Sequence, residues 1–411
     1  NPQKFIFMSA TNPLWASAVL LTERMVQPMD KPTVQDIFHR FYPAYLDQYS
    51  PSPVQAKVAH NIMNCKTGAY GANVCVCEDC GFVQIHYNSC RNRCCPMCQA
   101  VPKEMWMDAR REDVLDAPYF HLVFTVPDIL NPVIYSNQRL LYDALYHAAS
   151  STISELTADP KHLGAKVGYI CILHTWGSGM NFHPHIHTIL LGGGLASNNQ
   201  WKDNGENFFL PIRIISKVFR GKYLEELKRL WKEDKLVFHG TAEKFRNHYT
   251  FKELLDSCYG MDWIPHCKKT FNGAQTVIKY LGKYTHRIAV SNHRTVRMDD
   301  DTVTFLVKDY RNEGQWKELT ISGVEFVRRF LMHVPPRRFV RIRHYGLLCS
   351  RTKSQKLTLC RNLLGCKKYL SKLRDMEMPE ILEHLYGIKV CVCKACGGHL
   401  GKPQMRMPLR C

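Results

Sequence analysis

Two histidines separated by one residue lie in the most informative segment of the chain, NFHPHIHTILLGGG. If this apolar segment is a strand, His185 and His187 project from one face of a sheet, because side chains alternate between faces. Two imidazoles on one face can hold a divalent cation that polarises a scissile phosphate. His183 shares that face and is an alternative ligand. We choose His174, on the preceding predicted strand, as the third ligand.

Two tyrosines stand four residues apart later in the chain, in GAQTVIKYLGKYTHRIAV. On a helix Tyr280 and Tyr284 occupy one face, a turn apart. A phenolate can attack the phosphorus of DNA and keep the strand covalently bound, which conserves the energy of the broken bond. Because the pKa of tyrosine is about 10, this nucleophile needs a metal nearby that activates the phosphate. The basic residues predicted to meet the phosphate are Lys279, Lys283 and Arg287.

Each of these two motifs is weak by itself. Pairs of histidines with one residue between them are common by chance, and tyrosines four residues apart often pack a helix against a core. The catalytic interpretation therefore depends on finding both motifs in one chain.

A cluster of cysteines precedes both motifs, in CVCEDCGFVQIHYNSCRNRCCPMC. Two Cys-x-x-Cys knuckles allow four thiolates to meet tetrahedrally around zinc, and such a closed site is structural because it keeps no open position for chemistry. The four predicted ligands are Cys77, Cys80, Cys95 and Cys98. Other cysteines are candidates for a second zinc site, the alternative being buried thiols: Cys65, Cys90 and Cys94.

A further knuckle lies near the end of the chain, in CVCKACGGHLGKP. Cys393 and Cys396 form a single Cys-x-x-Cys pair, which needs two more ligands to hold zinc. Cys360 and Cys366 could complete it. The alternative is a tail that carries unligated thiols.

The charge of the chain points to a polyanionic partner. Lys and Arg number 55 against 36 Asp and Glu, an excess of 19 positive charges. Nucleic acid is the first candidate, and a merely soluble basic surface is the alternative. We expect DNA contacts from basic residues beside the cysteine cluster and from a basic, aromatic segment further on: Arg91, Arg93, Arg341 and Arg343.

No membrane segment is predicted. The apolar stretch at residues 15–21 is too short to span a bilayer and is followed at once by Glu23 and Arg24. Eight of the eighteen cysteines lie within residues 65–98 of a long basic chain, which favours metal ligation in a reducing cytoplasm over a disulfide framework.

Hydrophobic periodicity predicts an α+β fold with a largely antiparallel sheet flanked by helices. Strands are expected at 119–126, 167–175, 184–191, 302–307 and 316–321, and helices at 33–49, 54–63, 101–115, 136–156, 215–232 and 273–284. The glycine-rich GSGMNF predicts a hairpin between the second and third strands. The expected regions are an unstructured extension at 1–30, a small helical and zinc-binding domain at 31–115, a catalytic domain at 116–335, and a basic C-terminal region with a zinc knuckle at 336–411.

Taken together and in this order, the histidine pair and the tyrosine helix resemble the HUH superfamily of single-strand DNA endonucleases, named for histidine, hydrophobic residue, histidine. Within it, the chain is similar to the IS91-like, two-tyrosine transposases of rolling-circle insertion sequences. The resemblance covers residues 35–350 and is carried by four blocks: NSCRNRCCPMCQ, LHTWGSGMNFHPHIHTILLGGGL, KYLGKYTHRIAVSNHR and FVRIRHYGLL.

This resemblance implies an N-terminal zinc-binding domain, an HUH catalytic domain, and transposition by nicking one strand at an element end. The nucleophile would take the 5′ phosphate and leave a free 3′ hydroxyl. By motif position, His185 and His187 would be the metal pair, Tyr280 the first catalytic tyrosine and Tyr284 the second.

One departure concerns the zinc ligands. Such sequences usually read Arg-His-Cys-Pro where this chain reads Arg93-Cys94-Cys95-Pro96. One zinc ligand would then be a thiolate in place of an imidazole.

The function expected is that of a metal-dependent DNA transposase with Mg²⁺ or Mn²⁺ at the histidines and structural Zn²⁺. Its partners would be single-stranded DNA and element-end DNA, and it would work in the bacterial cytoplasm, at the nucleoid. A homo-oligomer is possible from the sequence. One alternative is a replication initiator or relaxase, which shares the nicking chemistry. The other is a non-catalytic zinc-containing DNA-binding protein, which needs neither His187 nor Tyr280.

Overall fold

The computed structural model describes residues 31–204, 210–263, 265–271, 277, 282, 288–309, 313–402 and 404–406. A central sheet in the order β11-β4-β5-β3-β7 dominates it, with β6 paired to β5. Every strand pair described in this sheet is antiparallel. Its strands are β3 (Tyr119–Thr125), β4 (Lys166–Trp176), β5 (Phe182–Leu195), β6 (Trp201–Asp203), β7 (His266–Phe271) and β11 (Ile342–Gly346).

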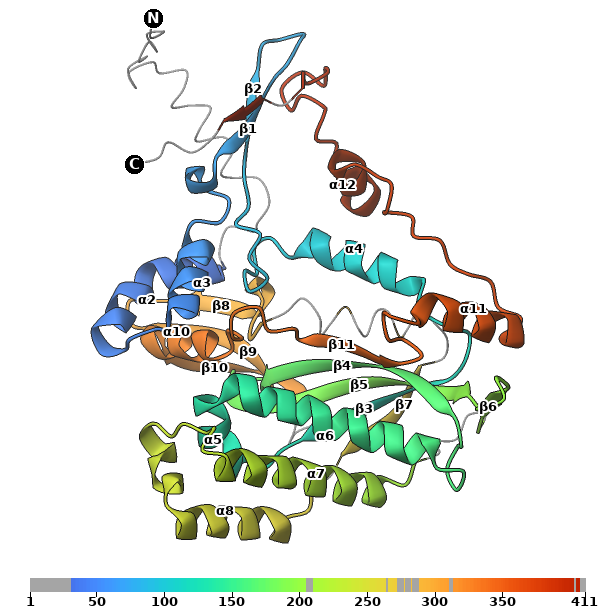
Figure 1. The fold of residues 1–411 in the computed structure, drawn as a ribbon. Coiled ribbons are helices and arrows are strands. Elements are labelled where there is room, and N and C mark those ends of the chain that lie inside the picture. The colour runs from blue at the N-terminus through green and yellow to red at the C-terminus, as the bar shows by residue number, and fades with distance from the viewer. Residues whose placement is uncertain are drawn as a thin grey trace, which may run out of the picture.

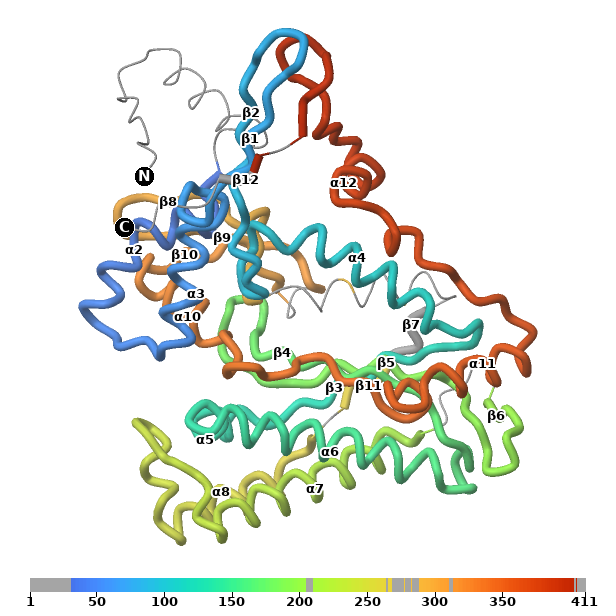
Figure 2. Tube along the Cα trace, turned by 45° about the horizontal axis from the view of Figure 1, so that its top comes forward, coloured from blue at the N-terminus to red at the C-terminus, as the bar shows by residue number. Residues whose placement is uncertain are grey.

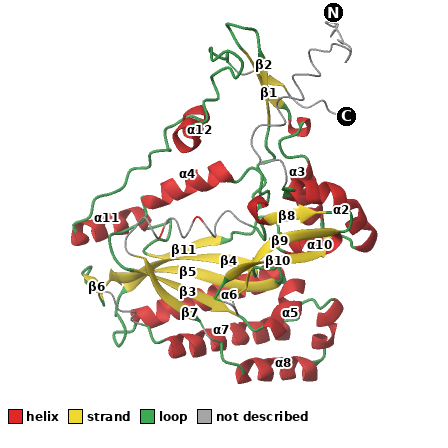
Figure 3. Cartoon of the chain, turned by 180° about the vertical axis from the view of Figure 1, so that it is seen from behind, coloured by secondary structure: helices red, strands yellow, loops and turns green. Residues whose placement is uncertain are grey.

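Helices cover both faces of this sheet, as Figure 1 and the view from behind in Figure 3 show. On one side lie α5 (Asn131–Ser136), α6 (Gln138–Ala158), α7 (Ile212–Lys232) and α8 (His248–Gly260). On the other side lie α4 (Ala100–Arg111) and α11 (Lys353–Leu364). The α+β fold with a largely antiparallel sheet is therefore confirmed.

The largest core lies between the sheet and helices α6 and α7. In β3, Phe120, Leu122 and Phe124 face this core, and all three are fully buried there. The alternation of these residues with Tyr119 and Val123 gives the strand its two faces. Burial of such side chains contributes about 1.5–3 kcal/mol each, so this face anchors the fold.

A second core joins the start of the chain to residues 288–334. Helices α2 (Val34–Gln48) and α3 (Pro53–Met63) pack there against helix α10 (Gly323–Met332) and the sheet β10-β9-β8. The strands of that sheet are β8 (Thr295–Met298), β9 (Thr302–Asp309) and β10 (Gln315–Ser322). The expected cap is present: the Thr33 hydroxyl accepts a hydrogen bond from the Asp36 backbone N–H at 3.2 Å.

A small third sheet projects from these layers. Figures 1 and 2 show the hairpin of β1 (Ala72–Val76) and β2 (Val83–Tyr87) beside the last part of the chain. There β12 (Gln404–Arg406) pairs with β1. The C-terminal arm, residues 365–402, runs from α11 past α12 (Met378–Tyr386) to this hairpin. Short 3-10 turns complete the description: η1 (Gly68–Tyr70), η2 (Asp128–Leu130), η3 (Gly240–Arg246) and η4 (Asn292–Arg294).

The packing divides the chain differently from the linear division expected at 115 and 335. Helices α2 and α3 share their core with residues 288–334, and β11, beyond residue 335, is an edge strand of the central sheet. Contacts between distant segments decide these boundaries, and local composition does not report them. Among the described helices, none is both long and apolar enough to cross a membrane.

Candidate functional site

Three histidines meet on the face of the central sheet opposite α6 and α7. His174 comes from β4, and His185 and His187 come from the adjacent strand β5, where His174 lies directly across from His185. Each offers a ring nitrogen, and these atoms lie within 4.8 Å of one another. All three side chains are buried. The structure thus brings together the three residues chosen as ligands.

The spacing of the ring nitrogens suits a metal ion. His185 Nε2 and His187 Nε2 are 3.0 Å apart. Two ligands about 2.1 Å from a cation and at right angles to each other are separated by about 3.0 Å, the adjacent edge of an octahedron. The ring nitrogens of His185 and His187 are therefore spaced as two adjacent ligands of one divalent cation.

The opposite ring nitrogens of the pair are engaged by protein atoms. His185 Nδ1 donates to the carbonyl oxygen of His183 at 2.6 Å, and His187 Nδ1 lies 2.9 Å from Nε2 of His121. Such contacts hold a ring and select the tautomer that leaves its other nitrogen free to bind a metal. The His183 side chain itself lies 3.1 Å from Asp128, so the alternative ligand points away from the group.

Burial keeps these imidazoles neutral. It lowers the pKa of His185 and of His121 to about 4. The pKa of His187 is held well below its usual value by burial and then by the neighbouring histidines. At neutral pH the rings therefore carry lone pairs, which a metal requires of histidine ligands.

His121 is the site residue that sequence reasoning missed. It lies on β3, where Val123 is directly opposite His187, and its ring stacks on that of His187 at 5.1 Å. The signal in the sequence was a histidine inside the apolar strand YFHLVFT. That signal could be used only with knowledge that β3 pairs with β5.

The two tyrosines of the predicted helix, Tyr280 and Tyr284, lie outside the described residues. The basic residues beside them also lie outside: Lys279, Lys283 and Arg287. Two described residues bracket Tyr280. Val277 is buried in a core on the histidine face, with Ile172 and Ile189. Gly282 is also buried, and a Cβ added there would meet the Met107 sulfur of α4 at 1.9 Å.

The first cysteine group lies at the base of the hairpin. It consists of Cys65, Cys90, Cys95 and Cys98, whose sulfurs lie within 4.8 Å of one another. Cys94 does not belong to it. Burial raises the pKa of the Cys94 thiol to about 11, and Arg341 is the first of its charged neighbours. The prediction that Cys94 is a ligand is therefore wrong.

The predicted quartet of Cys77, Cys80, Cys95 and Cys98 is also wrong, because the hairpin separates its halves. Strands β1 and β2 pair from Ala72 and Tyr87 to Val76 and Val83, which is five residue pairs. At about 3.4 Å per pair, the turn that holds Cys77 and Cys80 lies roughly 15 Å from the base of the hairpin. The partners that the structure gives this turn are instead Cys393 and Cys396.

The remaining candidates for the C-terminal knuckle lie elsewhere. Cys360 is buried in the core beneath α11, and Cys366 packs against that same core. Neither belongs to a cysteine group in the described chain.

Most of the basic residues expected to contact DNA have protein partners. Arg93 donates to the carbonyl oxygens of Phe339 at 2.6 Å and Pro336 at 3.4 Å. Arg341 is buried. Arg343 forms an ion pair with Asp143 and stacks over the ring of Tyr146 at 4.0 Å. These three guanidinium groups are therefore engaged by the fold, although only Arg341 is buried and Arg93 is exposed. Arg91 is exposed, and the described contacts give it no such partner.

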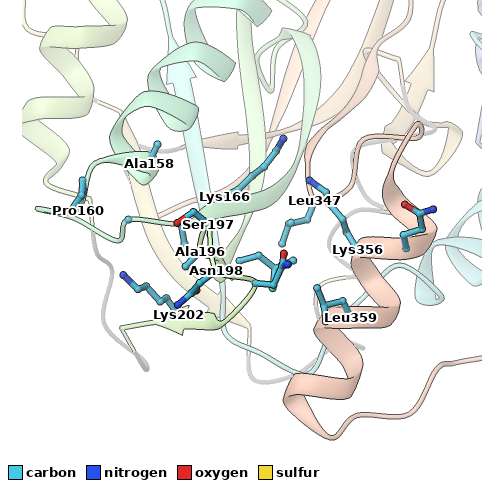
Figure 4. Close-up of a pocket in the computed structure, with 15 residues that line it drawn as sticks. Ala158, Pro160, Lys166, Ala196, Ser197, Asn198, Lys202, Leu347, Lys356 and Leu359 are labelled. Carbon is cyan, nitrogen blue, oxygen red and sulfur yellow. The ribbon is translucent and has the colours of Figure 1, made fainter.

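A hollow of about 840 Å³ lies at the other end of β4 and β5 (Figure 4). Lysines from three elements line it: Lys166 of β4, Lys202 of β6 and Lys356 of α11. Lys166 and His174 are eight residues apart along β4, or roughly 26 Å. The hollow is therefore separate from the histidine group.

Comparison with protein families matches two models to this chain. A model described as "Putative transposase" matches residues 168–356, and one described as "Transposase zinc-binding domain" matches residues 37–126. The first range contains all three histidines, and the second contains the cysteine group at the base of the hairpin.

Curated relatives resemble the chain over most of its length. "Putative transposase y4qJ" of Sinorhizobium fredii is 40% identical over 369 residues, which is 89% of this chain and 93% of the relative. "Transposase for insertion sequence element IS801" of Pseudomonas savastanoi pv. phaseolicola is 30% identical over 309 residues, which is 74% of this chain and 72% of the relative.

Among solved structures, the conjugative relaxase TrwC in complex with oriT DNA is similar to part of the chain. The match covers 40% of this chain and 71% of the relaxase, with 13% identity and a TM-score of 0.23.

Proposed function

The chain belongs to the IS91-like family of insertion-sequence transposases, and from that premise we propose that it nicks one DNA strand at an element end and transfers it through a covalent 5′-phosphotyrosine. The observation that carries this proposal is the group of His174, His185 and His187 on one sheet face. Its substrates would be single-stranded and element-end DNA, which implies a cytoplasmic protein at the bacterial nucleoid.

The chemistry needs a nucleophile and an electrophile. The phenolate oxygen of Tyr280 attacks the scissile phosphorus, a tyrosine–phosphorus bond forms, and the bond to the 3′ oxygen breaks. The 3′ oxygen takes up a proton and leaves as a free hydroxyl. One phosphodiester replaces another, so a second 3′ hydroxyl can reverse the reaction and join a new strand. Tyr284 would serve in a second transfer.

The three histidines fit a divalent cation, for which we propose Mg²⁺ or Mn²⁺. A cation bound there would polarise a phosphate oxygen and make the phosphorus more electrophilic. The residues around it have their own tasks: the carbonyl of His183 and the ring of His121 hold the pair in position. Imidazole ligands also suit Zn²⁺ and Ni²⁺, so the choice of ion needs a test.

Two described residues, one on either side of Tyr280 in the sequence, lie on the histidine side of the sheet. Val277 packs on the histidine face, against residues of β4 and β5. Gly282 lies against α4 on that same side of the sheet. These two neighbours support the proposal that this segment supplies the nucleophile.

The proposal is tested by mixing the protein with single-stranded oligonucleotides that span the element ends. With Mg²⁺, Mn²⁺, Ni²⁺ or Zn²⁺ present, a covalent adduct should appear on a denaturing gel and fade in His187→Ala. Tyr280→Phe and Tyr284→Phe rank the two nucleophiles.

Matched controls separate chemistry from folding. His147 on α6 and Tyr249 on α8 are exposed on the other side of the molecule, so His147→Ala and Tyr249→Phe should retain the adduct. Absence of an adduct with every metal, while DNA binding persists, would favour the non-catalytic DNA-binding protein.

A further inference from the structure

We propose that Cys77, Cys80, Cys393 and Cys396 bind a second structural zinc ion, which fastens the C-terminal arm to the hairpin β1–β2. The two halves of this site lie at opposite ends of the sequence. Its second half, Cys393 and Cys396, lies outside the matched zinc-binding range, residues 37–126. The inference does not depend on the nicking chemistry.

The distances between sulfurs are those of a tetrahedral zinc site. Cys77 Sγ lies 3.6 Å from Cys396 Sγ, and Cys80 Sγ lies 3.7 Å from Cys393 Sγ. Four sulfurs placed about 2.3 Å from a zinc ion at tetrahedral angles are separated by about 3.8 Å. A disulfide would need about 2.05 Å. The spacing therefore fits four thiolates around one ion.

The two knuckles have the same backbone geometry. In the first, the N–H of Gly81 donates to the carbonyl of Cys77 at 3.1 Å, and in the second the N–H of Gly397 donates to the carbonyl of Cys393 at 3.0 Å. Both glycines have positive φ, +71° and +79°, which other residues adopt only with strain. Each turn thereby directs its pair of sulfurs to one point.

Backbone N–H groups also point at the sulfurs of the C-terminal knuckle. The N–H of Ala395 donates to Cys393 Sγ at 3.4 Å, and that of Gly398 donates to Cys396 Sγ at 3.4 Å. Donors placed in this way stabilise the negative charge of metal-bound thiolates, as expected of the groups that surround a metal site.

The apolar core at this junction is too small to hold the arm by itself. Among the described residues it contains Cys75, Cys77, Cys393 and Leu400, with Phe82 packed against them. Two of these four buried residues are proposed ligands. Small modules of this kind gain their stability from the metal, since binding free energy contributes directly to folding.

Backbone hydrogen bonds also pair the C-terminal arm with the hairpin β1–β2 next to the four sulfurs. Cys77 forms a β-bridge with Leu400, the N–H of Glu78 donates to His399 O at 3.1 Å, and the N–H of Gly401 donates to Val76 O at 2.9 Å. The metal would thus lock a small three-stranded module, completed by β12.

A second attachment holds the start of the arm to α4. The Asp108 carboxylate accepts hydrogen bonds from the Tyr369 hydroxyl at 2.6 Å and the Ser371 hydroxyl at 2.5 Å. Arg374 pairs with Glu112 at 2.6 Å. Loss of the proposed zinc would therefore free the arm beyond Arg374 and leave its contact with α4 intact.

Zinc content of the full-length protein tests the site. Cys393→Ser with Cys396→Ser should hold one zinc ion per chain fewer than wild type. Cys77→Ser with Cys80→Ser should give the same loss, because both pairs serve one ion. Cys349→Ser, at an exposed cysteine outside both groups, is the matched control and should keep the zinc content of wild type.

Limited proteolysis supplies a readout that remains useful if a variant folds poorly. Removing zinc from wild type with a chelator should let trypsin cleave the arm after Lys389 and Lys394, and adding Zn²⁺ back should restore protection. Unchanged zinc content in the Cys393 and Cys396 variant, iron in place of zinc, or protection that ignores the chelator would each overturn the proposal.

Discussion

The two faces of the central sheet use one set of strands for different purposes. On β5, Ile186 and Leu190 enter the apolar core beneath α6 and α7, whereas His185 and His187 point to the other face. The helix face gains free energy by excluding water. The histidine face buries polar rings at a cost, which is offset by the contacts of His185 Nδ1 with the His183 carbonyl and of His187 Nδ1 with His121. Because successive side chains of a strand point to opposite faces, neighbouring residues of β5 serve the apolar core and the metal group in turn.

The largest effect expected from this comparison is on the histidine face. His187→Ala should slow formation of the DNA adduct by about 1,000-fold or more, because a metal that polarises a phosphate contributes several kcal/mol. The rate is measured under saturating Mn²⁺, with circular dichroism to verify folding. A folded variant that forms the adduct at the wild-type rate would remove His187 from the site.

The opposite outcome is expected three residues away, on the helix face. Leu190 is fully buried in the apolar core, so Leu190→Ala should lower the free energy of unfolding by about 2–5 kcal/mol. Urea unfolding measures this loss. Adduct formation per folded molecule should stay near wild type, and a strong loss of activity in fully folded protein would show that the two faces are coupled.

A third prediction uses a buried histidine that has protein partners. His333 Nε2 donates to Met180 O at 3.0 Å and its Nδ1 accepts from the Thr175 hydroxyl at 3.1 Å. Burial lowers the pKa of His333 to about 4 from an ordinary 6.5. Between pH 6.5 and pH 4, His333 binds a proton in the unfolded chain but not in the folded protein. The free energy of unfolding therefore falls as pH falls through this window.

The loss attributable to His333 is about 3 kcal/mol, from a shift of roughly 2.5 pKa units. Other buried histidines add to the slope of wild type, so the comparison is between wild type and His333→Gln. Urea unfolding at several values between pH 7 and pH 4 should show a shallower decline in the variant. Parallel curves would mean that folding does not change the pKa of His333.

The smallest effect is expected at His121, which acts through His187. His121→Ala should weaken the apparent affinity for Mn²⁺ by about 10–100-fold, with less effect on the rate at saturating metal. His121→Gln, which can restore one hydrogen bond to His187, should recover part of the affinity. Equal metal dependence in all three proteins would leave His121 as a packing residue only.

Local pattern predicted much of the fold and the metal group. The runs that became β4 and β5, with a short glycine-containing turn between them, placed His174 beside His185 because antiparallel neighbours face each other. Thr33 was identified as a cap from its position before an amphipathic helix. These features depend on residues close together in the sequence, where spacing carries the information.

What the sequence did not reveal depends on pairing between distant segments. Cys77 was assigned to the nearest knuckle, although its partner Cys396 lies at the far end of the chain. His121 joined the site through the order of the strands, which no local pattern encodes. Helix α8 was not predicted. The sequence also did not show that the side chain of Arg341, predicted to contact DNA, is buried.

The core that unites α2 and α3 with α10 has a consequence for biosynthesis. Phe38 and Phe41 pack with Phe326 and Phe330, and the latter pair leaves the ribosome only after most of the chain has been made. Until then α2 and α3 carry an apolar surface whose partners from residues 288–334 of the described core have not yet been made. An N-terminal fragment released before the rest of the chain is complete would be prone to aggregate. We therefore expect the nascent chain to need chaperone protection during translation.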